Sequence, residues 1–205
     1  MLKSSMQKIC LILLMTAACV CQAGNQKEEQ LSNSVKALMQ KSISDLGAPK
    51  LMFASDTEGQ VWLSEMSERL KKRLPDQAYR EDFLRSVHYE ATRAGLDPQM
   101  VLGLIQVESA FKKYAVSSVG ARGYMQVMPF WTRVLANSDG KGGDASNLFH
   151  MQTNLRFGCV ILRHYLDREK GDLFLALGRY NGSRGKAPYP NAVLGAKRQW
   201  QFGKT

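Results

Sequence analysis

The 205-residue sequence predicts an all-α fold, and three observations support this class. Apolar residues recur every three or four positions over several segments, the spacing of one buried helix face. Residues that favour helix starts, and glycines or prolines that end helices, lie at the borders of these segments. The alternation of apolar and polar residues that marks a half-buried strand is absent over any useful length. We therefore expect helices packed around a common core.

Each expected helix has a start or end signal. Ser55 and Glu58 have the spacing of a capping box, and the helix that they start ends near Pro75. Asp97 and Pro98 are an N-cap acid and a proline at the first helical position. The other breaks are Gly47 with Pro49, Gly95, Gly171 and Gly182. The expected helices cover residues 25–46, 55–75, 76–93, 98–108, 129–136, 151–170, 172–182 and 191–202.

Residues 1–23 have the pattern of a secretory signal peptide. Lys3 and Lys8 precede an apolar run that is too short to span a bilayer comfortably. Small residues follow this run, and we expect cleavage after Ala23. The mature protein is then exported and has no transmembrane helix.

The cysteines offer a second processing site. Cys19 follows Thr16-Ala17-Ala18, a pattern similar to a bacterial lipoprotein site, but Thr16 stands where an aliphatic residue is usual. Lipidation at Cys19 is therefore the less favoured alternative. Without the signal only Cys159 remains, so no internal disulfide can form. Cys159 lies in an apolar helical pattern, and we expect a small buried side chain rather than a reactive thiol.

The formal net charge of +10 indicates a polyanionic partner, because a positive surface attracts acidic polymers. Nucleic acid would be the first guess for a cytosolic protein, but the expected export argues against it. An exported acidic polymer fits better, and a merely solvated basic surface fits equally well.

The stretch 101–128 contains the candidate site. Val101, Leu104 and Ile105 lie on the same helix face as Glu108, since spacings of three, four and seven residues stack side chains on one side. This apolar face must point into the core. Burial raises the pKa of a carboxyl group, which lets Glu108 hold a proton near neutral pH, as a general acid must.

Four motifs in a fixed order span roughly residues 86–200. They are Glu108-Ser109, then Ala115-Val116-Ser117 leading to the segment 120–129, then Asn154-Leu155 with Gly158, and Tyr180-Asn181. This order resembles the catalytic domain of soluble-type lytic transglycosylases, the SLT domain, a goose-type lysozyme-like all-α family that cleaves peptidoglycan. Two positions depart from the family pattern: Tyr124 replaces the usual Leu, and Arg179 replaces the usual Ala. Substrate contacts near these two positions are therefore in doubt.

The resemblance implies a reaction with one acid. Glu108 would protonate the oxygen of the β-1,4 bond between N-acetylmuramic acid and N-acetylglucosamine. As a carboxylate it would then take the proton of the muramic acid C6 hydroxyl, which leaves a 1,6-anhydro end. Tyr180 is expected to lie beside Glu108 and orient it with its hydroxyl. The implied substrate-binding residues are Ser109, Ser117, Met125, Gln126, Asn154 and Asn181.

Two other functions remain open from the sequence. A goose-type lysozyme-like muramidase would hydrolyse the same bond and would need Asp139 or Asp144 to position water, since ordinary glycosidases use two carboxylates. A non-catalytic peptidoglycan-binding module would not need Glu108. The two aspartates also prompt a calcium hypothesis, but their spacing lacks the pattern of an EF-hand loop. We expect a surface loop there, no metal and no cofactor.

The sequence and the resemblance together predict the organisation of the chain. Residues 1–23 form the signal peptide, 24–80 an N-terminal helical extension and 81–205 the catalytic domain. We expect a periplasmic monomer that binds peptidoglycan glycan strands and no nucleic acid. The sequence does not identify any partner in an envelope complex.

Overall fold

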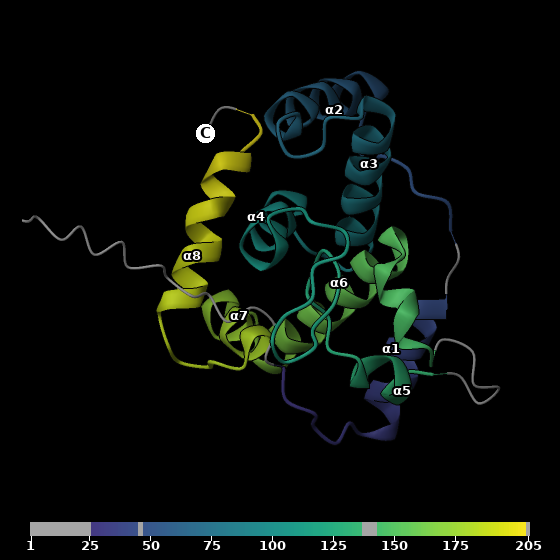
Figure 1. The fold of residues 1–205 in the computed structure, drawn as a ribbon, viewed down its shortest axis with the longest axis vertical. Coiled ribbons are helices and arrows are strands. Elements are labelled where there is room, and N and C mark those ends of the chain that lie inside the picture. Colours follow the sequence, from purple (N-terminus) through teal and green to yellow (C-terminus); the bar gives the residue numbers. More distant parts are fainter. Residues whose placement is uncertain (1–25, 45–46, 137–142, 204–205) are drawn as a thin grey trace, which may run out of the picture.

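The computed structural model describes residues 26–44, 47–136 and 143–203, and these residues form an all-α structure (Figure 1). No strand forms within them; the segment 116–127 contributes only the isolated bridges Val116–Arg122 and Arg122–Val127. The expected fold class is therefore confirmed. No helix in this described part is long and apolar enough to cross a membrane. The signal peptide, Cys19 and Asp139 lie outside the described residues.

The helices follow the expected order. They are α1 (Asn33–Ser44), α2 (Asp56–Leu70), α3 (Gln77–Arg93), α4 (Pro98–Ser109), α5 (Phe130–Val134), the 3-10 helix η1 (Ala145–Phe149), α6 (Met151–Arg168), α7 (Leu173–Asn181), α8 (Pro188–Lys197) and the 3-10 helix η2 (Arg198–Trp200). The first helix differs most from the expectation, because α1 begins at Asn33 rather than at residue 25. The last helix begins at Pro188 rather than at residue 191. Proline at the first helical position needs no hydrogen-bonded N–H, so Pro188 starts the helix instead of preceding it.

The ends of α4 place Glu108 at a helix terminus. Asp97 caps the start by accepting a hydrogen bond from the backbone N–H of Gln99. At the other end Ala110 and Phe111 have φ values of 49° and 65°, in the left-handed region. These two residues end the helix and turn the chain sharply, so Glu108 lies in the last turn of α4.

A single hydrophobic core surrounds α4, which lies centrally in Figure 1. Val101, Leu104 and Ile105 are fully buried, as their spacing predicts. The close approach of α4 to α8 depends on Gly103. A Cβ atom at Gly103 would lie only 2.7 Å from the backbone nitrogen of Lys197. This contact brings the start of α8 toward the end of α4.

The expected N-terminal extension shares this core. Met39 of α1 and Trp62, Met66 and Leu70 of α2 belong to the same buried cluster as Phe83 of α3. A boundary at residue 80 would fall inside α3. The division into extension and catalytic domain stays a prediction, and it is not a break in the packing of the described residues.

Candidate active site

Glu108 is buried at the end of α4, with 6% of its surface exposed. Its Oε1 atom accepts a hydrogen bond from the hydroxyl of Tyr189, in the first turn of α8. Within the described residues its Oε2 atom has no hydrogen-bond partner. Burial raises the pKa of Glu108 to about 8, while the hydrogen bond from Tyr189 acts in the lowering direction. Most of the population is therefore protonated at neutral pH.

Tyr189 was not identified from the sequence. Its side chain is 4% exposed and reaches Glu108 because α8 packs closely on α4. Pro188 and Pro190 flank Tyr189, and the sequence pattern therefore predicts that it lies in the loop before the last helix. The usable signal was Pro188, since proline favours the first position of a helix.

Tyr180 does not make the hydrogen bond to Glu108 that we expected. Its hydroxyl donates to the backbone carbonyl of Met125, at 2.7 Å. This carbonyl lies in the buried turn 122–128 and needs a donor, which accounts for the difference. Burial, together with the charge of Glu108, raises the pKa of Tyr180 well above its usual value. Tyr180 is therefore close enough to Glu108 to respond to its charge, but it is bonded to the neighbouring backbone.

Asn154 of α6 holds the turn 122–128 in place through side-chain hydrogen bonds. Its Oδ1 atom accepts a hydrogen bond from the N–H of Met125, and its Nδ2 atom donates to the carbonyls of Arg122 and Leu148, each at 2.8 Å. Gly123 lies directly against this amide, since a Cβ atom there would be 2.4 Å from the Asn154 Nδ2 atom. Asn154 is fully buried, so its effect on a substrate would act through the backbone that it holds.

Gln126 and Met125 are part of the same scaffold. Gln126 has a φ of 49° and donates from its Nε2 atom to the carbonyls of Ala115 and Gly123. Met125 is fully buried against Gly158, where a Cβ atom would lie 2.3 Å from the Met125 sulfur. A left-handed conformation at a residue other than glycine is strained and persists only when its surroundings enforce it.

The remaining predicted substrate residues lie near the ends of helices and turns. The Ser109 hydroxyl donates to the carbonyl of Ile105 in its own helix. The Ser117 hydroxyl is half-buried and accepts from the N–H of Ala121. Asn181, at the end of α7, accepts from the Ser183 hydroxyl. The substrate roles of all six residues, including Met125, Gln126 and Asn154, stay predictions.

The two departures from the family pattern have local explanations. The Tyr124 hydroxyl is 2.6 Å from the Tyr79 hydroxyl, and its ring packs on Phe83 in the core. Arg179 forms ion pairs with Glu169 and Glu29. Within the described residues, the hydrogen bond that Glu108 accepts comes from Tyr189 and not from either of these two side chains.

Metal-ligating side chains do not cluster in the described residues, where no group of three or more His, Cys, Asp or Glu is arranged to hold an ion. Asp144 is exposed and caps η1 by accepting from both the N–H and the hydroxyl of Ser146. Cys159 is buried and unpaired, as expected from its apolar pattern.

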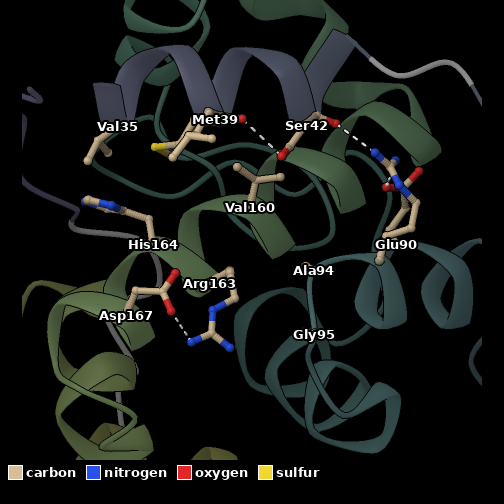
Figure 2. A pocket seen from close by; sticks show the side chains of 12 residues that line it. Val35, Met39, Ser42, Glu90, Ala94, Gly95, Val160, Arg163, His164 and Asp167 are labelled. Atoms are coloured by element: carbon tan, nitrogen blue, oxygen red, sulfur yellow. Dashed lines mark hydrogen bonds and ion pairs between the residues drawn. The ribbon is translucent and has the colours of Figure 1, made fainter. Parts of the chain in front are cut away.

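A cavity of about 580 Å³ lies away from Glu108, between α1, α3 and α6 (Figure 2). Figure 2 shows Val35 and Met39 on one side and Val160 on the other. Arg163 and Asp167 pair with each other at its edge. None of the predicted site residues lines this cavity, and its charged groups are neutralised by neighbours, so the buried acid and not the cavity defines the candidate site.

The all-α fold and the buried acid Glu108 at the end of its central helix define a lysozyme-like helical domain. The chain belongs to the transglycosylase SLT domain family, which matches residues 85–201. This match confirms the family that the order of motifs resembles.

Three curated relatives are similar to parts of the chain. A transglycosylase of Enterobacteria phage PRD1 is 35% identical over 109 residues, which are 53% of this chain and 36% of the relative. Membrane-bound lytic murein transglycosylase C of Haemophilus influenzae strain PittEE is 32% identical over 113 residues, 50% of this chain and 32% of the relative. The protein of that name from Actinobacillus pleuropneumoniae serotype 5b is 49% identical over 47 residues, 23% of this chain and 13% of the relative. The chain thus spans about a third of the length of the first two relatives.

Proposed function

We propose that this protein is an exported peptidoglycan lytic transglycosylase. It cleaves the β-1,4 bond between N-acetylmuramic acid and N-acetylglucosamine without water and leaves 1,6-anhydro ends. The observation that carries this proposal is the burial of the Glu108 carboxyl group, which raises its pKa to about 8. Membership of the SLT domain family and the printed names of the relatives support it.

The first step needs an acid. The protonated carboxyl of Glu108 donates its proton to the glycosidic oxygen while the bond from that oxygen to C1 of the muramic acid breaks. A pKa of about 8 suits this task, because the group is protonated at neutral pH and still gives up its proton. The free Oε2 atom, which has no partner in the described residues, is the natural position for this proton.

The second step needs a nucleophile. Ordinary glycosidases place a second carboxylate in the site, as nucleophile or as base for a water. Within the described residues, burial and Tyr189 account for the pKa of Glu108, and no second acid contributes. The C6 hydroxyl of the muramic acid attacks its own C1, and the Glu108 carboxylate takes the hydroxyl proton. The ring closes, and Glu108 is protonated again for the next cycle.

Tyr189 stabilises the Glu108 carboxylate that exists between the two steps. Its hydroxyl donates to Oε1 and so stabilises the negative charge in a buried place. It also fixes the orientation of the carboxyl group and leaves Oε2 without a hydrogen-bond partner in the described residues. We assign Tyr189 a positioning role and retain Tyr180 as a residue that supports the adjacent turn.

Hydrolysis is the second candidate. It would require Asp139 or Asp144 to position a water molecule. Asp139 lies outside the described residues, and the Asp144 carboxylate is engaged by Ser146. Hydrogen bonds from Ser146 lower the pKa of Asp144, which favours its role as a helix cap. A non-catalytic binding module has no use for a buried acid, whose burial costs stability.

The location follows from the N-terminal sequence. We propose export to the periplasm after cleavage at Ala23, with lipidation at Cys19 as the alternative. The name "membrane-bound" belongs to the Haemophilus relative. Mass spectrometry of the purified mature protein distinguishes the two: a chain beginning at Gly24 supports cleavage after Ala23, and an acylated Cys19 contradicts this processing site.

The direct test is Glu108→Gln. The amide keeps the shape and can still accept the Tyr189 hydrogen bond, but it cannot donate a proton to the leaving oxygen. We expect nearly all release of soluble fragments from peptidoglycan to be lost, while the melting temperature does not fall below that of wild type. Glu68→Gln on the exposed face of α2 is the matched control and should keep full activity. Activity of Glu108→Gln within about tenfold of wild type would remove Glu108 from the reaction.

A further inference from the structure

Residues 26–32 precede α1 and form an extended segment, which we call the N-terminal strap. In Figure 1 this segment leads from α1 toward α7. Lys27, Glu28 and Gln30 are exposed, as is normal for such a segment. Gln26 is the exception, because only 3% of its surface is exposed. A polar side chain is buried in this way only where it finds hydrogen-bond partners.

The carboxamide of Gln26 hydrogen-bonds to the backbone of the turn 122–128. Its Nε2 atom donates to the carbonyl of Gln126, at 3.2 Å, and its Oε1 atom accepts from the N–H of Met128, at 3.1 Å. One amide group thus pairs with a backbone acceptor and a backbone donor two residues apart. Gln126 is also the residue held in the left-handed conformation, so this edge of the turn is shaped independently of Gln26.

This edge is linked to the acid through Tyr180. The carbonyl of Met125, one residue before Gln126, accepts the hydrogen bond from Tyr180. Burial and the charge of Glu108 raise the pKa of Tyr180, and a hydrogen bond with Gln26 acts in the lowering direction. At Gln26 the strap therefore contacts residues near the Glu108 carboxyl group. These residues lie far from Gln26 in sequence.

Apart from Leu31, which is partly buried against the core, the rest of the strap is weakly attached. Within the described residues, no backbone-to-backbone hydrogen bond ties residues 26–31 to another segment. Glu29 pairs with Arg168 and Arg179, and Glu28 lies 4.0 Å from Arg133, all at partly or fully exposed positions. Exposed ion pairs contribute little to stability. The strap can therefore leave the turn at low cost while the helices stay folded.

We infer that Gln26 competes with the substrate for the backbone carbonyl of Gln126 and the backbone N–H of Met128. The strap is thus an autoinhibitory contact. This inference rests on the proposed function, because both sugars of peptidoglycan carry an acetamido group. An acetamido group offers one N–H donor and one carbonyl acceptor, as the Gln26 carboxamide does. Substrate binding then requires release of the strap. The apparent affinity equals the intrinsic affinity multiplied by the fraction of molecules whose strap is released.

The experiment measures binding without cleavage. Full-length Glu108→Gln protein is titrated with the tetramer of N-acetylglucosamine by calorimetry, alone and combined with Gln26→Ala. We expect Gln26→Ala to tighten binding about three- to tenfold, the effect of removing roughly one net hydrogen bond from the competing state. Gln30→Ala, an exposed glutamine of the same strap, is the matched control and should bind like the parent.

A second variant distinguishes loss of the hydrogen bonds from simple loss of packing at position 26. Gln26→Glu keeps the side-chain size, but its carboxylate cannot donate to the Gln126 carbonyl, so it should also tighten binding. Unchanged or weaker binding by both variants, with unchanged melting temperatures, contradicts the inference and makes Gln26 a structural tie. If wild-type protein leaves peptidoglycan intact while Gln26→Ala still tightens binding of the tetramer, the strap is supported and the proposed reaction is wrong.

Discussion

The Tyr189 hydroxyl donates a hydrogen bond to Oε1 of Glu108 across 81 residues of sequence. One partner lies in the last turn of α4 and the other in the first turn of α8. The two helix ends meet because Gly103 lets the helices approach closely. The buried acid therefore owes its orientation to the packing of two helices rather than to its own local sequence.

Tyr189→Phe should slow turnover and change its pH dependence. The loss of a hydrogen bond to a group that is charged during the cycle costs about 1.5–3 kcal/mol, or roughly a ten- to hundredfold loss of rate. The hydroxyl lowers the pKa of Glu108, so its removal raises that pKa above about 8. Because the acid must be protonated, the alkaline limb of the pH–rate profile should move to higher pH. A turnover rate and profile like those of wild type would remove Tyr189 from the site.

Tyr180→Phe is the comparison for this variant. It removes the donor to the buried Met125 carbonyl, so we expect a stability loss of about 1–3 kcal/mol in denaturant unfolding. The alkaline limb should stay in place, since Tyr180 does not hydrogen-bond Glu108 in this structure. The sequence interpretation, in which Tyr180 orients the acid, predicts the reverse: a shifted profile with stability almost unchanged.

Gly103→Ala should separate α4 from α8. The added methyl group would meet the backbone of Lys197, which cannot move aside as a flexible side chain can. We expect a loss of about 1–3 kcal/mol in the free energy of unfolding and reduced turnover, because Tyr189 moves away from Glu108. Gly195→Ala in the last turn of α8 is the control. A Cβ atom there meets only the end of Arg198, at 3.6 Å, so this variant should be neutral or slightly stabilising. Equal stability and activity of both variants would show that the helix contact is not tight.

Stability should depend on pH through Glu108. Its pKa is about 8 in the folded protein, against 4.5 for an ordinary glutamic acid. Between these values the folded state binds more protons than the unfolded state, so stability falls as pH rises. The loss is at most about 1.4 kcal/mol per pH unit. Relative to wild type, Glu108→Gln should therefore gain stability steadily between about pH 5 and about pH 8 in urea unfolding. Parallel curves for the two proteins would mean that Glu108 is solvated and ordinary.

The local features of the site could be predicted from the sequence. Val101, Leu104 and Ile105 placed Glu108 on an apolar helix face, and the structure confirms its burial and raised pKa. Asp97 and Pro98 marked the start of its helix, and the structure agrees. These features depend on spacing within one helix, which the sequence displays directly.

The contacts between distant elements could not be predicted. Tyr189 reaches Glu108 only through the packing of α8 on α4, and Gln26 reaches the turn at Gln126 from the far N-terminal side. Asn154 was expected to touch the substrate, a role that stays a prediction, and its hydrogen bonds join Met125 and Arg122 of the turn to Leu148 of η1. Nothing in the spacing of α6 indicates where a buried amide finds its partners. Such pairings arise from tertiary packing.

The most direct measurement is the mass of the fragments that the wild-type protein releases from purified peptidoglycan. A single acid that uses the C6 hydroxyl of the substrate must yield muramic acid ends that are one water lighter than reducing ends. We predict 1,6-anhydro ends throughout the digest and no fragments from Glu108→Gln. Reducing ends as the main product would contradict the account, because they require a water molecule and a second group to position it.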